Sequence, residues 1–132
     1  MKSKYVVLAS ALLISVATFA QKDQIKAAEK ALKGGKSQEA ATILAEAESL
    51  LSGASETEKA QFFFLKGNAS LDLATKKVNA DKNLEIATAA YKNLMDVEKA
   101  SGKVKYTPQA ITSMKDIKFS LINAAIADSK VD

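Results

Sequence analysis

Apolar residues recur every three or four positions through most of the chain, and short polar segments rich in Gly, Ser or Lys separate these stretches. That spacing places the apolar side chains on one side of an α-helix. The alternation of β-branched residues that is typical of strands is missing, so we expect an all-α fold without strands. Five helices are predicted, over residues 23–33, 37–51, 55–75, 81–100 and 107–127.

Local signals mark the ends of these helices. Ser55 and Glu58 match a capping box, in which each side chain accepts a hydrogen bond from the backbone N–H of the other residue. Ser37 and Thr107 are the expected N-caps of the second and fifth helices, with Pro108 at the first position of the fifth. Two helices are expected to end at glycine C-caps, at Gly34-Gly35 and at Gly102.

The third helix carries three consecutive phenylalanines, which point about 100° apart around a helix. Around this helix, Phe62, Leu65, Ala69 and Leu73 form one apolar side, Phe64 and Leu71 form the opposite side, and Phe63, Gly67, Ser70 and Ala74 lie between them. A helix with this distribution is expected to be buried on several sides. Gly67 would then allow a close approach between helices.

The first twenty residues have the layout of a secretory signal peptide. Lys2 and Lys4 precede an almost wholly apolar run from Tyr5 to Ala17, which is too short to span a membrane. Cleavage is expected after Ala20, so that residues 21–132 form the mature domain. This organisation predicts export to the periplasm or to the periplasmic face of the outer membrane.

The amino-acid composition argues against several classes of function for the mature domain. The chain contains no Arg, His, Cys or Trp, and removal of Lys2 and Lys4 lowers the net charge from +4 to +2. Without Arg, a nucleic-acid reader is not expected, because Arg supplies most contacts to base edges. Without His or Cys, the commonest general base, nucleophile pairs and metal ligands are missing. Paired acidic residues stand two positions apart in the sequence, so on a helix their carboxylates would point in different directions. We therefore expect neither an enzyme nor a cofactor.

Two internal patterns recur along the chain. Phe64-x3-Asn68-x2-Leu71 on the third helix matches Phe119-x3-Asn123-x2-Ile126 on the fifth, and the second and fourth helices share one spacing of small and large residues, Ala40-x3-Leu44-x2-Ala47 and Ala87-x3-Tyr91-x2-Leu94. These residues resemble the tetratricopeptide repeat (TPR) family, in which a small-x3-aromatic-x2-small pattern lies on the second helix of each pair. Gly67 is similar to the glycine at which TPR helices pack closely.

The resemblance implies antiparallel helix pairs stacked as a short right-handed α-solenoid, with repeats over residues 21–54 and 55–103 and a partial third repeat over 107–130 that is truncated after the fifth helix. It also implies helix-packing residues at Gly67, Ala40, Leu44, Ala47, Ala87 and Tyr91, and contact with a bound peptide at Asn68 and Asn123. With the neighbouring Phe64, Leu71 and Phe119, these two asparagines are the residues that we expect to contact a protein or peptide. An ordinary helical bundle is the alternative architecture. For the two asparagines, the alternative is a hydrogen bond to a neighbouring helix or loop.

Three functions remain open at this point. We expect an exported scaffold or adaptor that binds a partner protein or peptide in an envelope assembly. A small-ligand module and a self-associating structural protein are the alternatives. The fifth helix is strongly apolar, so it is expected either to continue a longer array, which we favour, or to dock on a partner or a second copy. Lysines border two loops, 76–82 and 99–105, where peripheral contact with a membrane is a further hypothesis.

Overall fold

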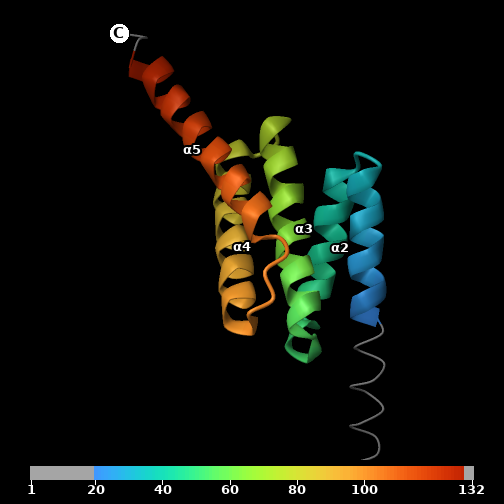
Figure 1. The fold of residues 1–132 in the computed structure, drawn as a ribbon. Helices are drawn as coiled ribbons and strands as arrows, with labels where there is room; N and C mark the ends of the chain where they lie inside the picture. The colour runs from blue at the N-terminus through green and yellow to red at the C-terminus, as the bar shows by residue number, and fades with distance from the viewer. Residues whose placement is uncertain (1–19, 130–132) are drawn as a thin grey trace, which may run out of the picture.

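A computed structural model describes residues 20–129, and the signal peptide expected before Gln21 lies almost entirely outside this range. Within it the chain is helical and contains no strand, which confirms the all-α prediction (Figure 1). Residues 20–33 form the first helix. The elements that follow are α2 (Ser37–Glu48), a short 3₁₀ turn η1 (Leu51–Gly53), α3 (Glu56–Thr75), α4 (Ala80–Ser101) and α5 (Thr107–Ser129).

Helix α3 is the centre of the arrangement. It lies between α4 on one side and the pair formed by α2 and helix 20–33 on the other (Figure 1). Its contact with α4 is the most extensive contact between the numbered elements. Helix α5 packs on α4 at its beginning and then projects beyond the other helices at its C-terminal end (Figure 1). Consecutive helices are joined by short turns.

Two hydrophobic clusters cover opposite sides of α3, which explains the three phenylalanines. Phe62 is fully buried in the cluster shared with α2 and helix 20–33. Phe64 packs against the cluster shared with α4 and α5, and Phe63 contacts both clusters. The prediction that this helix is buried on several sides is confirmed. Apolar side chains are removed from contact with water on both sides of α3. Burial of this helix therefore stabilises its packing against both clusters.

Several predicted helix ends are present. The Ser55 hydroxyl accepts a hydrogen bond from the Glu58 N–H at 3.2 Å, and the Glu58 carboxylate accepts one from the Ser55 N–H at 3.1 Å, so the capping box is confirmed. Gly35 and Gly102 adopt left-handed backbone conformations, with φ of 75° and 71°. Side chains other than glycine are strained there, so both glycines end their helices as expected.

Two predicted N-caps are wrong. Ser37 lies inside α2, Lys36 occupies the cap position, and the Ser37 hydroxyl donates to Asp72 instead of accepting from its own helix. Thr107 is the first residue of α5, and its hydroxyl donates to Glu98. In both cases the hydroxyl donates to a carboxylate of another helix, and such charge-assisted hydrogen bonds are stronger than those between neutral groups.

Two predicted boundaries also shift. Helix α2 ends at Glu48, three residues before the predicted end, and Leu51 belongs to the 3₁₀ turn instead. Helix α4 begins at Ala80, so the polar connection before it is shorter than expected. Lys77 and Asn79 adopt positive φ values of 61° and 41° in this tight turn. The turn brings α4 directly alongside α3.

Candidate binding cleft

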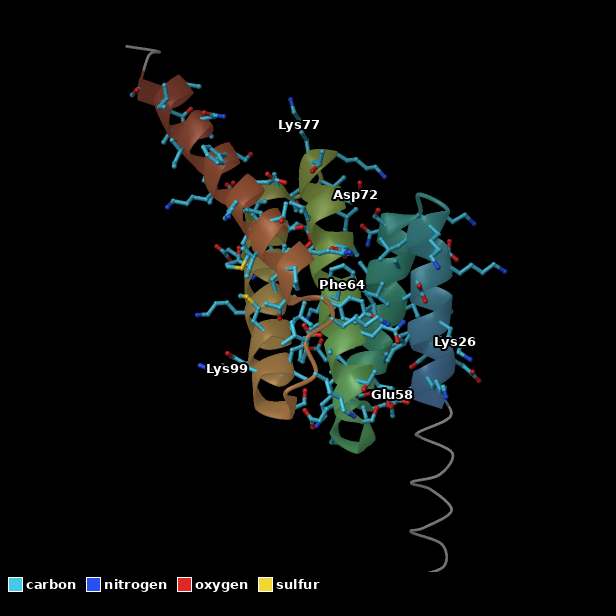
Figure 2. All side chains as sticks on the ribbon, viewed as in Figure 1. Lys26, Glu58, Phe64, Asp72, Lys77 and Lys99 are labelled. Atoms are coloured by element: carbon cyan, nitrogen blue, oxygen red, sulfur yellow. The ribbon has the colours of Figure 1, made fainter. Side chains whose placement is uncertain are left out.

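An open cleft of about 420 Å³ lies between helix 20–33 and α3. Its apolar surface comes from Leu32, Phe64 and Leu65. Its polar surface comes from both helices, from the turn after helix 20–33 and from the first residue of α2: Glu29, Lys33, Gly35, Ser37, Asn68, Asp72 and Lys76. Phe64 and Asp72 lie about two turns apart along α3 (Figure 2). The cleft is therefore apolar in the middle, with charged groups at its edges.

Phe64 forms one wall of this cleft and is held from behind by an aromatic contact. Its ring stacks on Tyr106, with the ring centroids 4.5 Å apart and the planes 19° from parallel. Tyr106 belongs to the loop that leads into α5. Stacked rings at this separation add roughly 0.5–1.5 kcal/mol to the gain from burial. The position of Phe64 in the cleft thus depends on the loop before α5.

Asn68 lines the same cleft, one turn after Phe64, and has an internal hydrogen bond as well. Its side-chain oxygen accepts a bond of 2.7 Å from the hydroxyl of Tyr91, which is fully buried on α4. The carboxamide oxygen therefore supports the packing of α3 on α4, whereas the carboxamide nitrogen is the donor that a ligand in the cleft could use. The hydrogen bond to a neighbouring helix, one of the two roles considered from the sequence, is therefore present, and contact of the carboxamide with a ligand stays a prediction.

Beside Asn68, α3 and α4 approach each other at Gly67. A Cβ atom placed on Gly67 would lie 2.4 Å from Cε1 of the Tyr91 ring. This is far inside the usual separation of about 3.5–4.0 Å between carbon atoms. The other residues expected to pack helices, Ala40, Leu44, Ala47 and Ala87, have exposed fractions of at most 1%.

One end of the cleft is closed by a polar network around Asp72. The Ser37 hydroxyl donates to its carboxylate, and the Lys76 ammonium lies 2.7 Å from the same oxygen. Lys76 also donates to the carbonyl of Gly35 at 3.3 Å. The hydrogen bonds from Lys76 and Ser37 hold the pKa of Asp72 below its ordinary value of 3.8. The network ties the turn after helix 20–33 to the C-terminal end of α3.

The loop before α5 is held by a buried carboxylate, that of Glu98. Its oxygens accept hydrogen bonds of 2.7–3.0 Å from the backbone N–H groups of Lys105, Tyr106 and Thr107 and from the Thr107 hydroxyl. Burial raises the pKa of Glu98, but these hydrogen bonds outweigh it and bring the pKa below its ordinary value of 4.5. Glu98 thereby positions Tyr106, the residue that stacks on Phe64.

The remaining predicted binding residues lie elsewhere. Leu71 is half-buried against the cluster between α3, α4 and α5. Phe119 and Asn123 lie on the exposed C-terminal half of α5, and neither lines the cleft. The structure therefore places Phe64 and Asn68 in the cleft, but not their counterparts on α5.

Sequence reasoning missed Ser37, Asp72 and Glu98 as partners in these networks. For Glu98 a signal existed, because it continues the buried i, i+3, i+4 pattern of Ala87, Tyr91 and Leu94. A carboxylate on the buried side of a helix indicates an internal set of donors. No comparable local pattern links Ser37 with Asp72, which lies 35 residues away.

Other kinds of site find less support in the described residues. Within residues 20–129, no group of three or more acidic side chains is placed to hold a metal ion. In the same range no helix is long and apolar enough to cross a membrane. Some of the loop lysines have internal partners: Lys76 pairs with Asp72, and the Lys105 ammonium lies 5.0 Å from the centroid of the Tyr106 ring. Contact of the other lysines with lipid stays a prediction.

Comparison of the chain with protein-family models, with curated proteins and with solved structures gives no match.

Proposed function

We propose that this chain is an exported helical-repeat scaffold of the envelope, and that it binds a segment of a partner protein in the cleft between helix 20–33 and α3. The observation that carries the proposal is the meeting of Phe64 and Asn68 on one wall of an open cleft. Both residues belong to the internal repeat, and the resemblance to TPR domains implies a ligand contact at Asn68. An apolar surface with a few fixed polar groups is typical of binding sites.

The arrangement of the helices supports a TPR-like solenoid as the framework. Helix 20–33 and α2 form one pair, α3 and α4 form the next, and α3 contacts both members of the first pair through one apolar cluster. In stacked helix pairs the first helices line a shared concave surface. The cleft lies between the first helices of the two pairs, where such a surface would bind an extended segment.

The chemistry of the cleft favours a peptide segment with an apolar side chain. Leu32, Phe64 and Leu65 offer an apolar surface, and the carboxamide nitrogen of Asn68 offers a donor for a peptide carbonyl. The lysines at the edge are already paired: Lys33 with Glu29 at 2.9 Å and Lys76 with Asp72 at 2.7 Å. A ligand that depends on a free cationic clamp is therefore a poorer fit than a neutral segment.

The experiment compares Asn68→Ala with Tyr91→Phe. Both substitutions remove the hydrogen bond between Asn68 and Tyr91, but only the first removes the carboxamide from the cleft. A photo-crosslinker at Leu32 would capture the partner from envelope extract, and the same crosslinker at the exposed Thr42 is the control for nonspecific capture.

We expect capture at Leu32 by the parent and by Tyr91→Phe, and loss of capture by Asn68→Ala. Both variants should melt below the parent, because each loses the hydrogen bond between Asn68 and Tyr91. Equal capture by all three proteins would remove Asn68 from the binding site. Equal capture from Leu32 and Thr42 would contradict the cleft itself. A full-length precursor that stays in the cytoplasm would contradict the location in the envelope.

A further inference from the structure

The first turn of helix 20–33 contains a buried side chain without a hydrogen bond, that of Gln21. This residue has an exposed fraction of 0%, and it lies on the same side of the helix as Ile25 and Ala28, four and seven positions later. Ile25 and Ala28 belong to the core cluster shared with α2 and α3. Within residues 20–129, neither Oε1 nor Nε2 of the Gln21 carboxamide has a hydrogen-bond partner.

The lack of partners is unusual for a side chain buried to this degree. Glu98 is equally buried, and its carboxylate accepts hydrogen bonds from three backbone N–H groups and one hydroxyl. Buried polar groups in proteins are normally paired in this way, because an unpaired donor or acceptor has lost its water without compensation. The primary carboxamide of Gln21 is therefore poorly matched to its surroundings.

Signal-peptide cleavage would place a reactive group beside this carboxamide. The step rests on the proposed function, which includes export and cleavage after Ala20. As long as Ala20 precedes it, the backbone nitrogen of Gln21 is an amide. After cleavage it becomes a free α-amino group, and a bond from this nitrogen to the side-chain Cδ closes a five-membered ring. Because both groups belong to one residue, the reaction needs no second reactant.

The start of a helix favours the reactive form of this amine. The first N–H groups of a helix have no partner within the helix, so the terminal nitrogen is not held by a backbone hydrogen bond. The N-terminal end also carries about half a positive elementary charge, which disfavours a protonated amine at that point. The neutral amine is the nucleophile, and conversion to an amide removes the cation from the helix end altogether.

We propose that Gln21 of the mature chain cyclises to pyroglutamate, and that its place at the start of helix 20–33 promotes the reaction. The neutral α-amino nitrogen attacks Cδ, and a bond forms between these two atoms. The bond between Cδ and Nε2 breaks. One proton passes from the attacking nitrogen to Nε2, which leaves as ammonia. Nothing is oxidised or reduced.

The product is better matched to this position than the reactant. The unpaired Nε2 atom is gone, and the lactam keeps one N–H group and one oxygen. The helix then begins with a neutral group, so the unfavourable charge at its N-terminal end is removed. A chain that begins with pyroglutamate has no free α-amino group, so we expect the mature protein to resist aminopeptidases.

Intact mass and fragmentation of the N-terminal peptide of the exported protein test the proposal. We expect a chain that begins at residue 21 and lacks one ammonia, with the loss assigned to residue 21 and not to Gln24. Gln21→Asn is the matched control. It keeps a primary carboxamide at the terminus, but its side chain is one carbon too short for the five-membered lactam, so it should retain its ammonia.

The outcomes separate this proposal from the proposed function. A parent chain that begins at Gln21 and retains its ammonia would overturn the cyclisation and leave cleavage after Ala20 intact. An N-terminus at another residue would overturn both. Capture by the crosslinker at Leu32 decides the binding cleft independently of either result.

A second measurement tests the contribution of the fold. The chain 21–132 is released from a fusion that is cut immediately before Gln21, and loss of ammonia is followed beside a peptide of residues 21–33. A peptide of this length is at most marginally helical in water. We expect the folded chain to cyclise about two- to fivefold faster than the peptide, from the effect of the helix end on the amine. An equal or slower rate would refute promotion by the helix.

Discussion

Substitution of Gly67 by alanine is expected to destabilise the protein, although helix propensity favours alanine. Alanine inside a helix gains about 1 kcal/mol over glycine. At Gly67, however, the new Cβ would lie 2.4, 2.7 and 2.8 Å from Cε1, Cδ1 and Cζ of the Tyr91 ring. To restore a normal separation of about 3.5 Å, the ring or the helix must move by roughly 1 Å.

The Tyr91 ring has little freedom to make this movement. It is fully buried, and its hydroxyl is bonded to Asn68. Overpacking of a buried site typically costs about 1–3 kcal/mol, and loss of the hydrogen bond costs about 1 kcal/mol. Against the gain of about 1 kcal/mol from propensity, we expect a net loss of about 2 kcal/mol. For a domain of this size, that corresponds to a fall in melting temperature of roughly 8–15 °C. Gly67→Leu adds more atoms at the same point and should be worse.

The assay is urea unfolding followed by circular dichroism, applied to a double-mutant cycle of Gly67→Ala and Tyr91→Leu. Tyr91→Leu alone should be destabilising, because it removes a buried ring. In that background the clash is gone, so Gly67→Ala should become neutral or stabilising by up to about 1 kcal/mol. The predicted clash is refuted if Gly67→Ala is more stable to urea than the parent. It is also refuted if the loss is the same with and without Tyr91.

Three further predictions concern other parts of the chain. Glu98→Gln should lower stability by about 3 kcal/mol, because an amide replaces one carboxylate oxygen among the N–H donors. The folded-state pKa of Glu98 is below 4.5, so its contribution to the free energy of unfolding is present above pH 4.5 and is lost as pH falls through the folded-state pKa. The free energy of unfolding should therefore change less with pH in the acid range for Glu98→Gln than for the parent. Ser55→Ala should cost about 1 kcal/mol in the same unfolding assay, and Ser52→Ala, at an exposed position, should cost less than half of that. Mass spectrometry of the exported protein should show an N-terminus at Gln21, and retention of residues 5–19 would contradict cleavage after Ala20.

Sequence alone determined the all-α class, most of the helix ends and the burial of α3 on several sides. These features depend on interactions within a few residues. The capping box joins Ser55 to Glu58, and the glycines at 35 and 102 act through their own backbone conformation. The spacing of apolar residues likewise describes one helix at a time, so it identifies which sides of α3 are buried without identifying the partner on each side.

Tertiary structure alone decided which distant polar groups meet. The sequence predicts that Ser37 caps its own helix, but its hydroxyl donates to Asp72, 35 residues later. The Thr107 hydroxyl likewise donates to Glu98. The carboxamide oxygen of Asn68 accepts from Tyr91, although the residue also lines the cleft, because α3 and α4 cross beside Gly67. A hydrogen bond requires two atoms to approach within about 3 Å, and the crossing of two helices determines which atoms do so. The pattern within either helix does not contain that information.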